Sequence, residues 1–129
     1  MFALFAWTFV VSLRNLQVRI VAMRERQVKE RYFEVFDGDA PATVIKTGNN
    51  LRNLTEFPPL FYVAILLLIV RGSADVTFLW LAWAYVAFRI LHSAVHLSIN
   101  KVRPRFAMFF ASQLVLLAIW GRLAWQFAG

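Results

Sequence analysis

Residues 49–70 read NNLRNLTEFPPLFYVAILLLIV, a polar segment followed directly by an apolar one. The apolar part, residues 57–70, rises about 21 Å as a helix, which is short of a hydrocarbon core of about 30 Å. We therefore expect the polar part, residues 49–56, to belong to the same helix and to lie within or at the edge of a membrane. Pro58 and Pro59 interrupt backbone hydrogen bonds in this helix, which membrane helices tolerate where neighbouring helices cover the break.

The rest of the chain supplies three more apolar stretches and short polar connections. Four predicted spans, at about 1–23, 48–70, 76–97 and 106–127, form a single transmembrane domain over residues 1–129. The first stretch lacks the positive n-region and the small-residue cleavage site of a signal peptide, so we expect it to be retained. Composition agrees, because 60% of the residues are hydrophobic, against roughly 45–50% apolar residues in soluble domains. The sequence therefore predicts an all-α, integral membrane four-helix bundle.

The charge composition restricts the partners and the chemistry. Fourteen Lys and Arg residues against seven Asp and Glu residues give a net charge of +7. The short connections offer no broad basic surface for nucleic acid, so we expect no nucleic-acid partner and take anionic lipid head groups as the natural one. There is no cysteine, which excludes disulfides and thiolate nucleophiles of the chain itself, so any thiol must come with a substrate.

The basic residues also predict an orientation. Most of them lie in the connections 24–46 and 98–105, whereas the opposite side offers only Arg71 and Arg122. The positive-inside rule then makes both basic connections cytoplasmic and places both termini outside. We expect one interfacial belt of aromatic side chains near the outer ends of the spans, formed by Trp7, Trp80, Trp83, Trp120 and Trp125.

Two polar stripes stand out within the predicted spans, both in their cytoplasmic halves. Helical spacing gathers each set on one face. The residues are Asn49, Arg52, Asn53 and Glu56 on the second helix, and Tyr85, Arg89, His92 and His96 on the third. A charge at this depth costs a few kcal/mol or more. We therefore expect the stripes to face a bundle interior, to pair with each other or to line a wet cavity.

The charges at this level are not balanced. The cations are Arg19, Arg52 and Arg89, with Arg103 and Arg105 at the helix mouths. The only acidic residue among them is Glu56, whereas an ion-pair network that merely joined the helices would have as many anions as cations. Arginine forks suit carboxylates, so we expect an anionic ligand to complete the cluster.

Two other functions, a metal or haem site and a transporter, would use the same residues. His92 and His96, one turn apart, suit a metal or haem, but only Glu56 offers a third ligand and Arg89 is adjacent, which favours a hydrogen-bonded histidine pair. Four-helix multidrug exporters have a similar length and depend on a lone intramembrane carboxylate. Glu56 lies one turn from Arg52 amid surplus positive charge, which disfavours a transporter.

The whole pattern resembles the MAPEG family, the membrane-associated proteins in eicosanoid and glutathione metabolism. The motifs that carry the resemblance are Gln17-Val18-Arg19, Arg52-Asn53-x-x-Glu56 with Pro58-Pro59, Arg89-x-x-His92, and Lys101-Val102-Arg103-Pro104-Arg105. The similarity covers nearly the whole chain. It implies a homotrimer in the lipid bilayer, with glutathione bound between neighbouring subunits near the cytoplasmic side.

The resemblance also implies which residues act. Those that match the glutathione-binding positions are Arg19, Asn49, Arg52, Asn53, Glu56, Arg89, His92 and His96. The ligand's two carboxylates then pair with arginines and its ammonium with Glu56. Arg105 matches best the arginine that activates the thiol at the mouth of the last helix, with Arg103 as the alternative. A nearby guanidinium favours the thiolate, which is the reactive nucleophile.

Three departures from eicosanoid members bear on activity. Asn49 replaces an arginine and His96 a tyrosine, and Phe106 stands where some members have a hydroxyl residue. These changes weaken anion binding and remove a hydrogen bond to the thiol. The expected function is a glutathione transferase or peroxidase of a bacterial inner membrane, acting on a lipophilic electrophile or hydroperoxide that arrives from the bilayer. The alternative is a member that binds another anionic metabolite or does not turn over.

Overall fold

The computed structural model describes residues 1–36 and 38–128, and within these ranges the regular structure is entirely helical. The helices are α1 (Phe2–Arg24), α2 (Glu30–Val35), α3 (Ala42–Glu56), α4 (Pro58–Arg71), α5 (Val76–Leu97) and α6 (Val102–Ala128). Four segments of the described chain are long and apolar enough to cross a membrane: α1, α3 with α4, α5, and α6. The expected number of spans is thereby confirmed.

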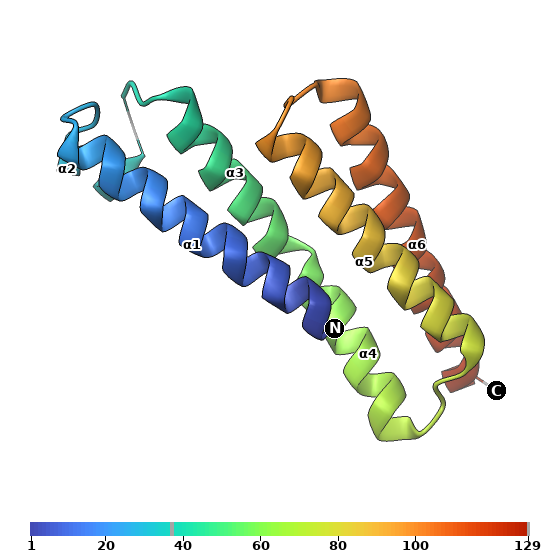
Figure 1. Cartoon of the computed structure of the whole chain (residues 1–129). Coiled ribbons are helices and arrows are strands. Elements are labelled where there is room, and N and C mark those ends of the chain that lie inside the picture. The colour runs from blue at the N-terminus through green and yellow to red at the C-terminus, as the bar shows by residue number, and fades with distance from the viewer. Residues whose placement is uncertain (37, 129) are drawn as a thin grey trace.

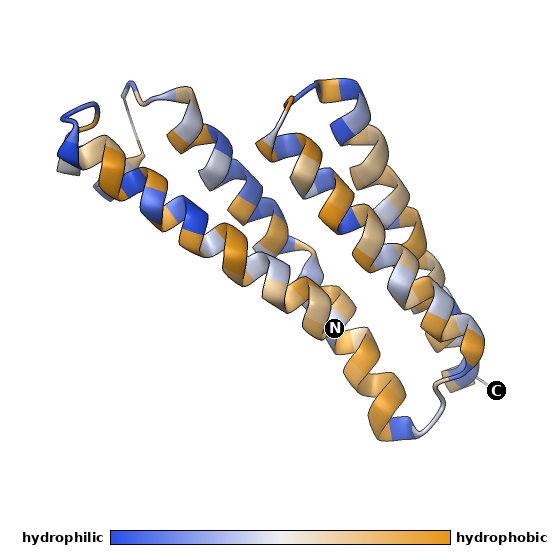
Figure 2. Ribbon diagram, viewed as in Figure 1, coloured by the Kyte–Doolittle hydropathy of each residue, from blue (hydrophilic) through white to orange (hydrophobic). Residues whose placement is uncertain are grey.

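The long helices form two neighbouring pairs. Figure 1 shows α1 alongside α3 and α5 alongside α6, with α4 continuing α3 beyond a bend. The connections 25–41 and 98–101 lie at the same end of the bundle, which we call the basic end. The last turn of α6 and the turn 72–75 lie at the other, the turn end. Hydrophilic residues concentrate on α3 and on the neighbouring half of α1, whereas α4 is almost wholly apolar (Figure 2).

The polar and apolar parts of residues 49–70 belong to one candidate span, which the prolines divide into two helices. Helix α3 ends at Glu56 and α4 begins at Pro58, because the proline nitrogens cannot donate to the carbonyls one turn before them. Helix α3 begins at Ala42 rather than near residue 48, so the second span is longer than expected. The break therefore lies well inside the span.

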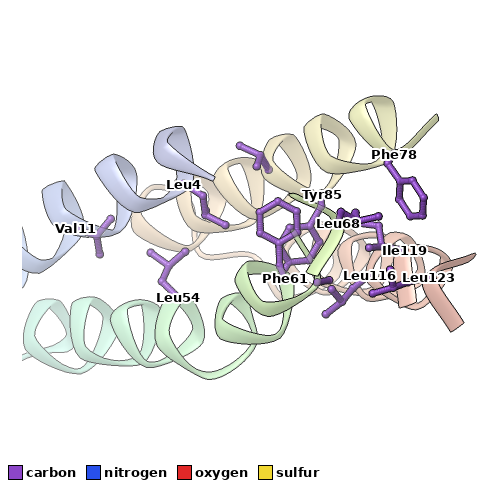
Figure 3. Packing of buried hydrophobic residues seen from close by; sticks show 12 residues of the cluster. Leu4, Val11, Leu54, Phe61, Leu68, Phe78, Tyr85, Leu116, Ile119 and Leu123 are labelled. Atoms are coloured by element: carbon purple, nitrogen blue, oxygen red, sulfur yellow. The ribbon is translucent and has the colours of Figure 1, made fainter. Parts of the chain in front are cut away.

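The larger buried core runs from Val11 and Leu54 to the turn end, and a smaller one, Ala22, Val28 and Val44, lies toward the basic end. Phe61 of α4 and Tyr85 of α5 stack with ring centroids 4.5 Å apart, and buried aliphatic side chains of α6 pack around them (Figure 3). Tyr85 is fully buried in this cluster. It is therefore a packing residue within the subunit.

The predicted tryptophan belt is wrong for Trp7. Figure 1 places the start of α1 beside α4, short of the turn 72–75. The Trp7 Nε1 group donates a 2.8 Å hydrogen bond to the hydroxyl of Ser93, which lies in the basic-end half of α5. Trp80 and Trp125, at the turn end, are exposed as expected. Helix α1 is thus shifted along the bundle toward the basic end.

Asp75 joins α5 to α6 at the turn end. Its Oδ1 caps α5 by accepting a 2.9 Å hydrogen bond from the backbone N–H of Phe78, and its Oδ2 forms an ion pair with Arg122. The hydrogen bond from Phe78 and the nearby guanidinium hold the pKa of the Asp75 carboxyl below its usual value. The charged form is therefore favoured in the folded protein.

We expect Asp75→Ala to lower the unfolding midpoint in detergent micelles, because it removes both the cap and the ion pair. Asp75→Asn should lower it less, since asparagine also caps helices. A carboxyl with a depressed folded pKa stabilises the protein above its unfolded pKa of about 4, and this contribution is lost as the pH falls through the folded pKa. The unfolding midpoints of wild type and Asp75→Asn should therefore differ at pH 7 and approach each other at pH 3. A constant gap between them would contradict the assigned role.

Candidate functional site

The polar stripe of α3 lies on the outside of the subunit. Its inward face is formed by buried residues that include Asn50 and Leu54, so Asn49, Arg52 and Glu56 point away from the bundle and are exposed. The Arg52 and Glu56 side chains keep 74% and 52% of their surface accessible, and Arg52 Nε lies 3.9 Å from Glu56 Oε1. The two residues pair as expected, but they do not face their own bundle interior.

The depth of this stripe makes its exposure significant. A hydrocarbon core of about 30 Å corresponds to about 20 helical residues. If Arg71 marks its edge at the turn end, the other edge lies near Leu51. Glu56 therefore lies inside the core and Arg52 near its edge. On a lone subunit these charged groups would meet lipid, which is costly. The stripe requires a polar covering.

The stripe of α5, in contrast, lies inside the subunit. Arg89 is fully buried, and His92 and His96 are each 3% exposed. The two stripes meet through the backbone, where Arg89 Nη2 donates to the carbonyl of Asn53. The Nε and Nη1 atoms of Arg89 are buried without a hydrogen-bond partner among the described residues. Asn53 itself is half-buried, and its Nδ2 donates to the Asn49 carbonyl at 3.0 Å.

Arg105 joins α5 to α6 near the basic end. Its Nη1 lies 2.8 Å from Asn100 Oδ1 and 3.3 Å from His96 Nε2. Its carbonyl lies 2.9 Å from His92 Nδ1. Because a guanidinium only donates and a carbonyl only accepts, His96 Nε2 is the acceptor and His92 Nδ1 carries a proton. Arg105 is half-buried and oriented by these contacts, whereas Arg103 is exposed.

Arg19 lies apart from this group. Its guanidinium carbon is 5.3 Å from the ring centroids of both Phe33 and Phe36, which belong to α2 and its C-cap. Each distance lies within the range of a cation–π interaction. The shift of α1 toward the basic end accounts for this position, and the expected common depth of Arg19 and the α3 stripe is not observed.

A comparison with known families matches residues 1–125 to the MAPEG family. The chain belongs to the MAPEG family. The match covers almost the entire sequence, and with four candidate spans in the described residues it identifies a multi-pass integral membrane protein of a family linked to glutathione and eicosanoid metabolism. No curated protein and no solved structure matches the chain.

The structure adds residues to this MAPEG chain that sequence reasoning missed. Ser93, fully buried on α5, accepts hydrogen bonds of 2.8 Å from both Trp7 of α1 and Asn50 of α3. Small polar side chains are common where membrane helices meet, and that was the available signal. The Ser93 hydroxyl thereby connects the helices that carry the two polar stripes.

We expect Ser93→Ala to destabilise the protein by about 1–3 kcal/mol, because two buried donors lose their acceptor. Ser112→Ala is the matched control, since Ser112 is also fully buried but its hydroxyl donates to the Phe109 carbonyl of its own helix at 2.6 Å. Unfolding of the two variants in detergent, followed by circular dichroism, measures the difference. Equal destabilisation would show that the connection between helices is unimportant.

The histidine pair of this MAPEG protein gives little support to a metal site. The described residues contain no group of three or more His, Asp or Glu side chains placed to hold a metal ion. The rings of His92 and His96 lie 5.9 Å apart, and each has one nitrogen engaged by Arg105. A guanidinium in that place repels a metal cation.

Proposed function

We propose that this MAPEG protein is a glutathione-dependent membrane transferase or peroxidase that acts on lipophilic electrophiles or hydroperoxides. We further propose that it works as a homotrimer with glutathione between subunits. The basic end then faces the cytoplasm of a bacterial cell, and the second substrate enters from the inner membrane.

The outward-facing α3 stripe is the observation that carries the proposal. A charged pair inside the hydrocarbon depth, with more than half of each side chain exposed, is satisfied when a neighbouring subunit covers it and a polar ligand fills the space between. Family membership makes glutathione the first ligand to consider. Its carboxylates suit Arg52 and the amides of Asn49 and Asn53, and its ammonium suits Glu56.

Arg105 is the favoured activating residue. Hydrogen bonds fix its Nη1 on His96 and Asn100, and within the described residues no hydrogen bond engages its Nε or Nη2. A guanidinium held in this way stabilises a thiolate beside it. The thiolate attacks the electrophilic carbon and forms a thioether. The bond from that carbon to the leaving group breaks, and the leaving group takes the electron pair. With a hydroperoxide the thiolate attacks the outer oxygen, so that an S–O bond forms, the O–O bond breaks and the alkoxide takes a proton from water to leave as the alcohol. A second glutathione then attacks the sulfenic acid formed, which gives glutathione disulfide and water.

Titration calorimetry of the purified oligomer in detergent tests the binding step. We expect saturable binding of glutathione and none of free cysteine at the same concentration, because cysteine has the thiol but only one carboxylate. Native mass spectrometry should show three copies of the chain. A protein that takes up no glutathione at millimolar concentration would contradict the proposal.

A binding protein without turnover is the second candidate. Phe106, next to Arg105, is exposed and has no hydroxyl to offer a thiol. Saturable glutathione binding, with no conjugation of a lipophilic electrophile and no reduction of a hydroperoxide, would favour this reading. Proton-coupled efflux from vesicles would instead favour a transporter.

A further inference from the structure

The proline break inside the second span leaves the end of α3 short of donors. The last four carbonyls of a helix have no partner within it. Here the next residues include Pro58 and Pro59, whose nitrogens cannot donate to the carbonyls of Leu54 and Thr55. Within the hydrocarbon depth there is no bulk water to replace them. This end of α3 also carries the partial negative charge of the helix dipole.

Arg89 is the cation that reaches this end. It is fully buried on α5, and its Nη2 donates to the carbonyl of Asn53, in the last turn of α3. The ion pairs among the described residues are Arg52 with Glu56 and Arg122 with Asp75. Arg89 therefore has no carboxylate within 4.0 Å in the described part of the chain. Its guanidinium carbon also lies 5.6 Å from the centroid of the Phe109 ring.

The geometry of Arg89 does not suit direct ligand binding on the α3 stripe. Arg52 and Glu56 are exposed on the outer surface of the subunit, whereas Arg89 has no exposed surface and lies behind the α3 backbone. A ligand on the stripe meets the side chains of α3 first. What Arg89 contacts is the turn of backbone from which those side chains project.

We propose that Arg89 is a positioning residue. Its guanidinium neutralises the C-terminal end of α3 at the Pro58–Pro59 break and so fixes the turn that presents Arg52, Asn53 and Glu56. The first half of this inference concerns the fold alone, and the second half rests on the proposed glutathione function. A cation at a helix C-terminus is favourable, which explains how a buried arginine persists here without a carboxylate.

A double-mutant cycle without glutathione tests the first half. We expect Arg89→Met to reduce the folding equilibrium constant in detergent by about tenfold or more, because the buried carbonyl end of α3 loses the positive charge that offsets its partial negative charge. In the Pro58→Ala/Pro59→Ala background, α3 can continue into α4 with its own N–H donors. There the same substitution should lower the logarithm of the folding equilibrium constant by less than half as much. Equal losses in the two backgrounds would overturn the proposal. Because no ligand is added, a protein that does not bind glutathione still gives an answer.

The conservative variant Arg89→Lys tests the second half and remains informative if Arg89→Met does not fold. A lysine supplies a point charge that suits a helix end, but it cannot replace an arginine fork on a carboxylate. We expect Arg89→Lys to keep the wild-type unfolding midpoint and to bind glutathione within about threefold of wild type. Normal stability with binding weakened tenfold or more would overturn the positioning role, because Arg89 would then contact the ligand itself.

Discussion

Glutathione binding is expected to weaken by about 10- to 100-fold in Arg52→Ala, with the fold unchanged. A charge-assisted hydrogen bond contributes about 1.5–3 kcal/mol, and a fork on a carboxylate makes two of them. The Arg52 side chain is 74% exposed and its contact is with Glu56 of its own helix, so its removal should not disturb the subunit core. Calorimetry of the purified protein in detergent gives the affinity, and circular dichroism gives the helix content.

Arg14→Ala is the matched control for this experiment. Arg14 is also an exposed arginine on a membrane helix, and its Nη1 donates to Gln17 one turn away at 3.0 Å. It carries the same charge and lies outside the α3 stripe, so it should bind glutathione like wild type. If both substitutions weaken binding equally, the effect is one of net charge. If Arg52→Ala binds normally, the ligand does not lie on α3.

The four spans and the break in the second of them follow from the sequence because they depend on local chemistry. Hydrophobic length sets a span, and a proline pair removes two donors wherever it stands. The direction in which a polar stripe faces is different, because it depends on what else packs against the helix. Asn49 and Asn50 are neighbours of identical chemistry, yet Asn50 is fully buried and Asn49 is exposed.

In the sequence, the cations near the depth of the α3 stripe outnumber the anions, and Arg19 is among them because its distance from the end of the first span suggests that depth. Sequence periodicity does not reveal how far one helix slides along another, and Arg19 lies against α2 instead.

Arg89 was counted as a second surplus cation, because a sequence does not show that backbone carbonyls will serve as the partner of a guanidinium. Its Nη2 donates to the Asn53 carbonyl, whereas its Nε and Nη1 have no hydrogen-bond partner among the described residues. The proposed ligand therefore meets the exposed α3 stripe first, and Arg105 lies nearer the basic end.

Turnover is expected to fall by about 100-fold or more in Arg105→Leu, which is the range seen when a donor that stabilises developing negative charge is removed. In the proposed mechanism the guanidinium favours the thiolate of glutathione, so the pKa of that thiol should lie below its usual value of about 8.5 in the wild-type complex. Without Arg105 the thiolate should form only as the pH rises above that value. The ultraviolet absorption of the thiolate, followed against pH with glutathione saturating, measures the change directly.

Arg103→Leu decides between the two arginines that the sequence left open. Arg105 is held by Asn100 and His96, whereas Arg103, two residues earlier in the chain, is exposed. A flexible exposed arginine must lose conformational freedom to stabilise a thiolate, and an oriented one has already lost it. We therefore expect Arg103→Leu to keep the wild-type thiolate titration and turnover. If Arg103→Leu loses the thiolate and Arg105→Leu keeps it, the activating role belongs to Arg103, and the contacts of Arg105 serve only to join α5 to α6.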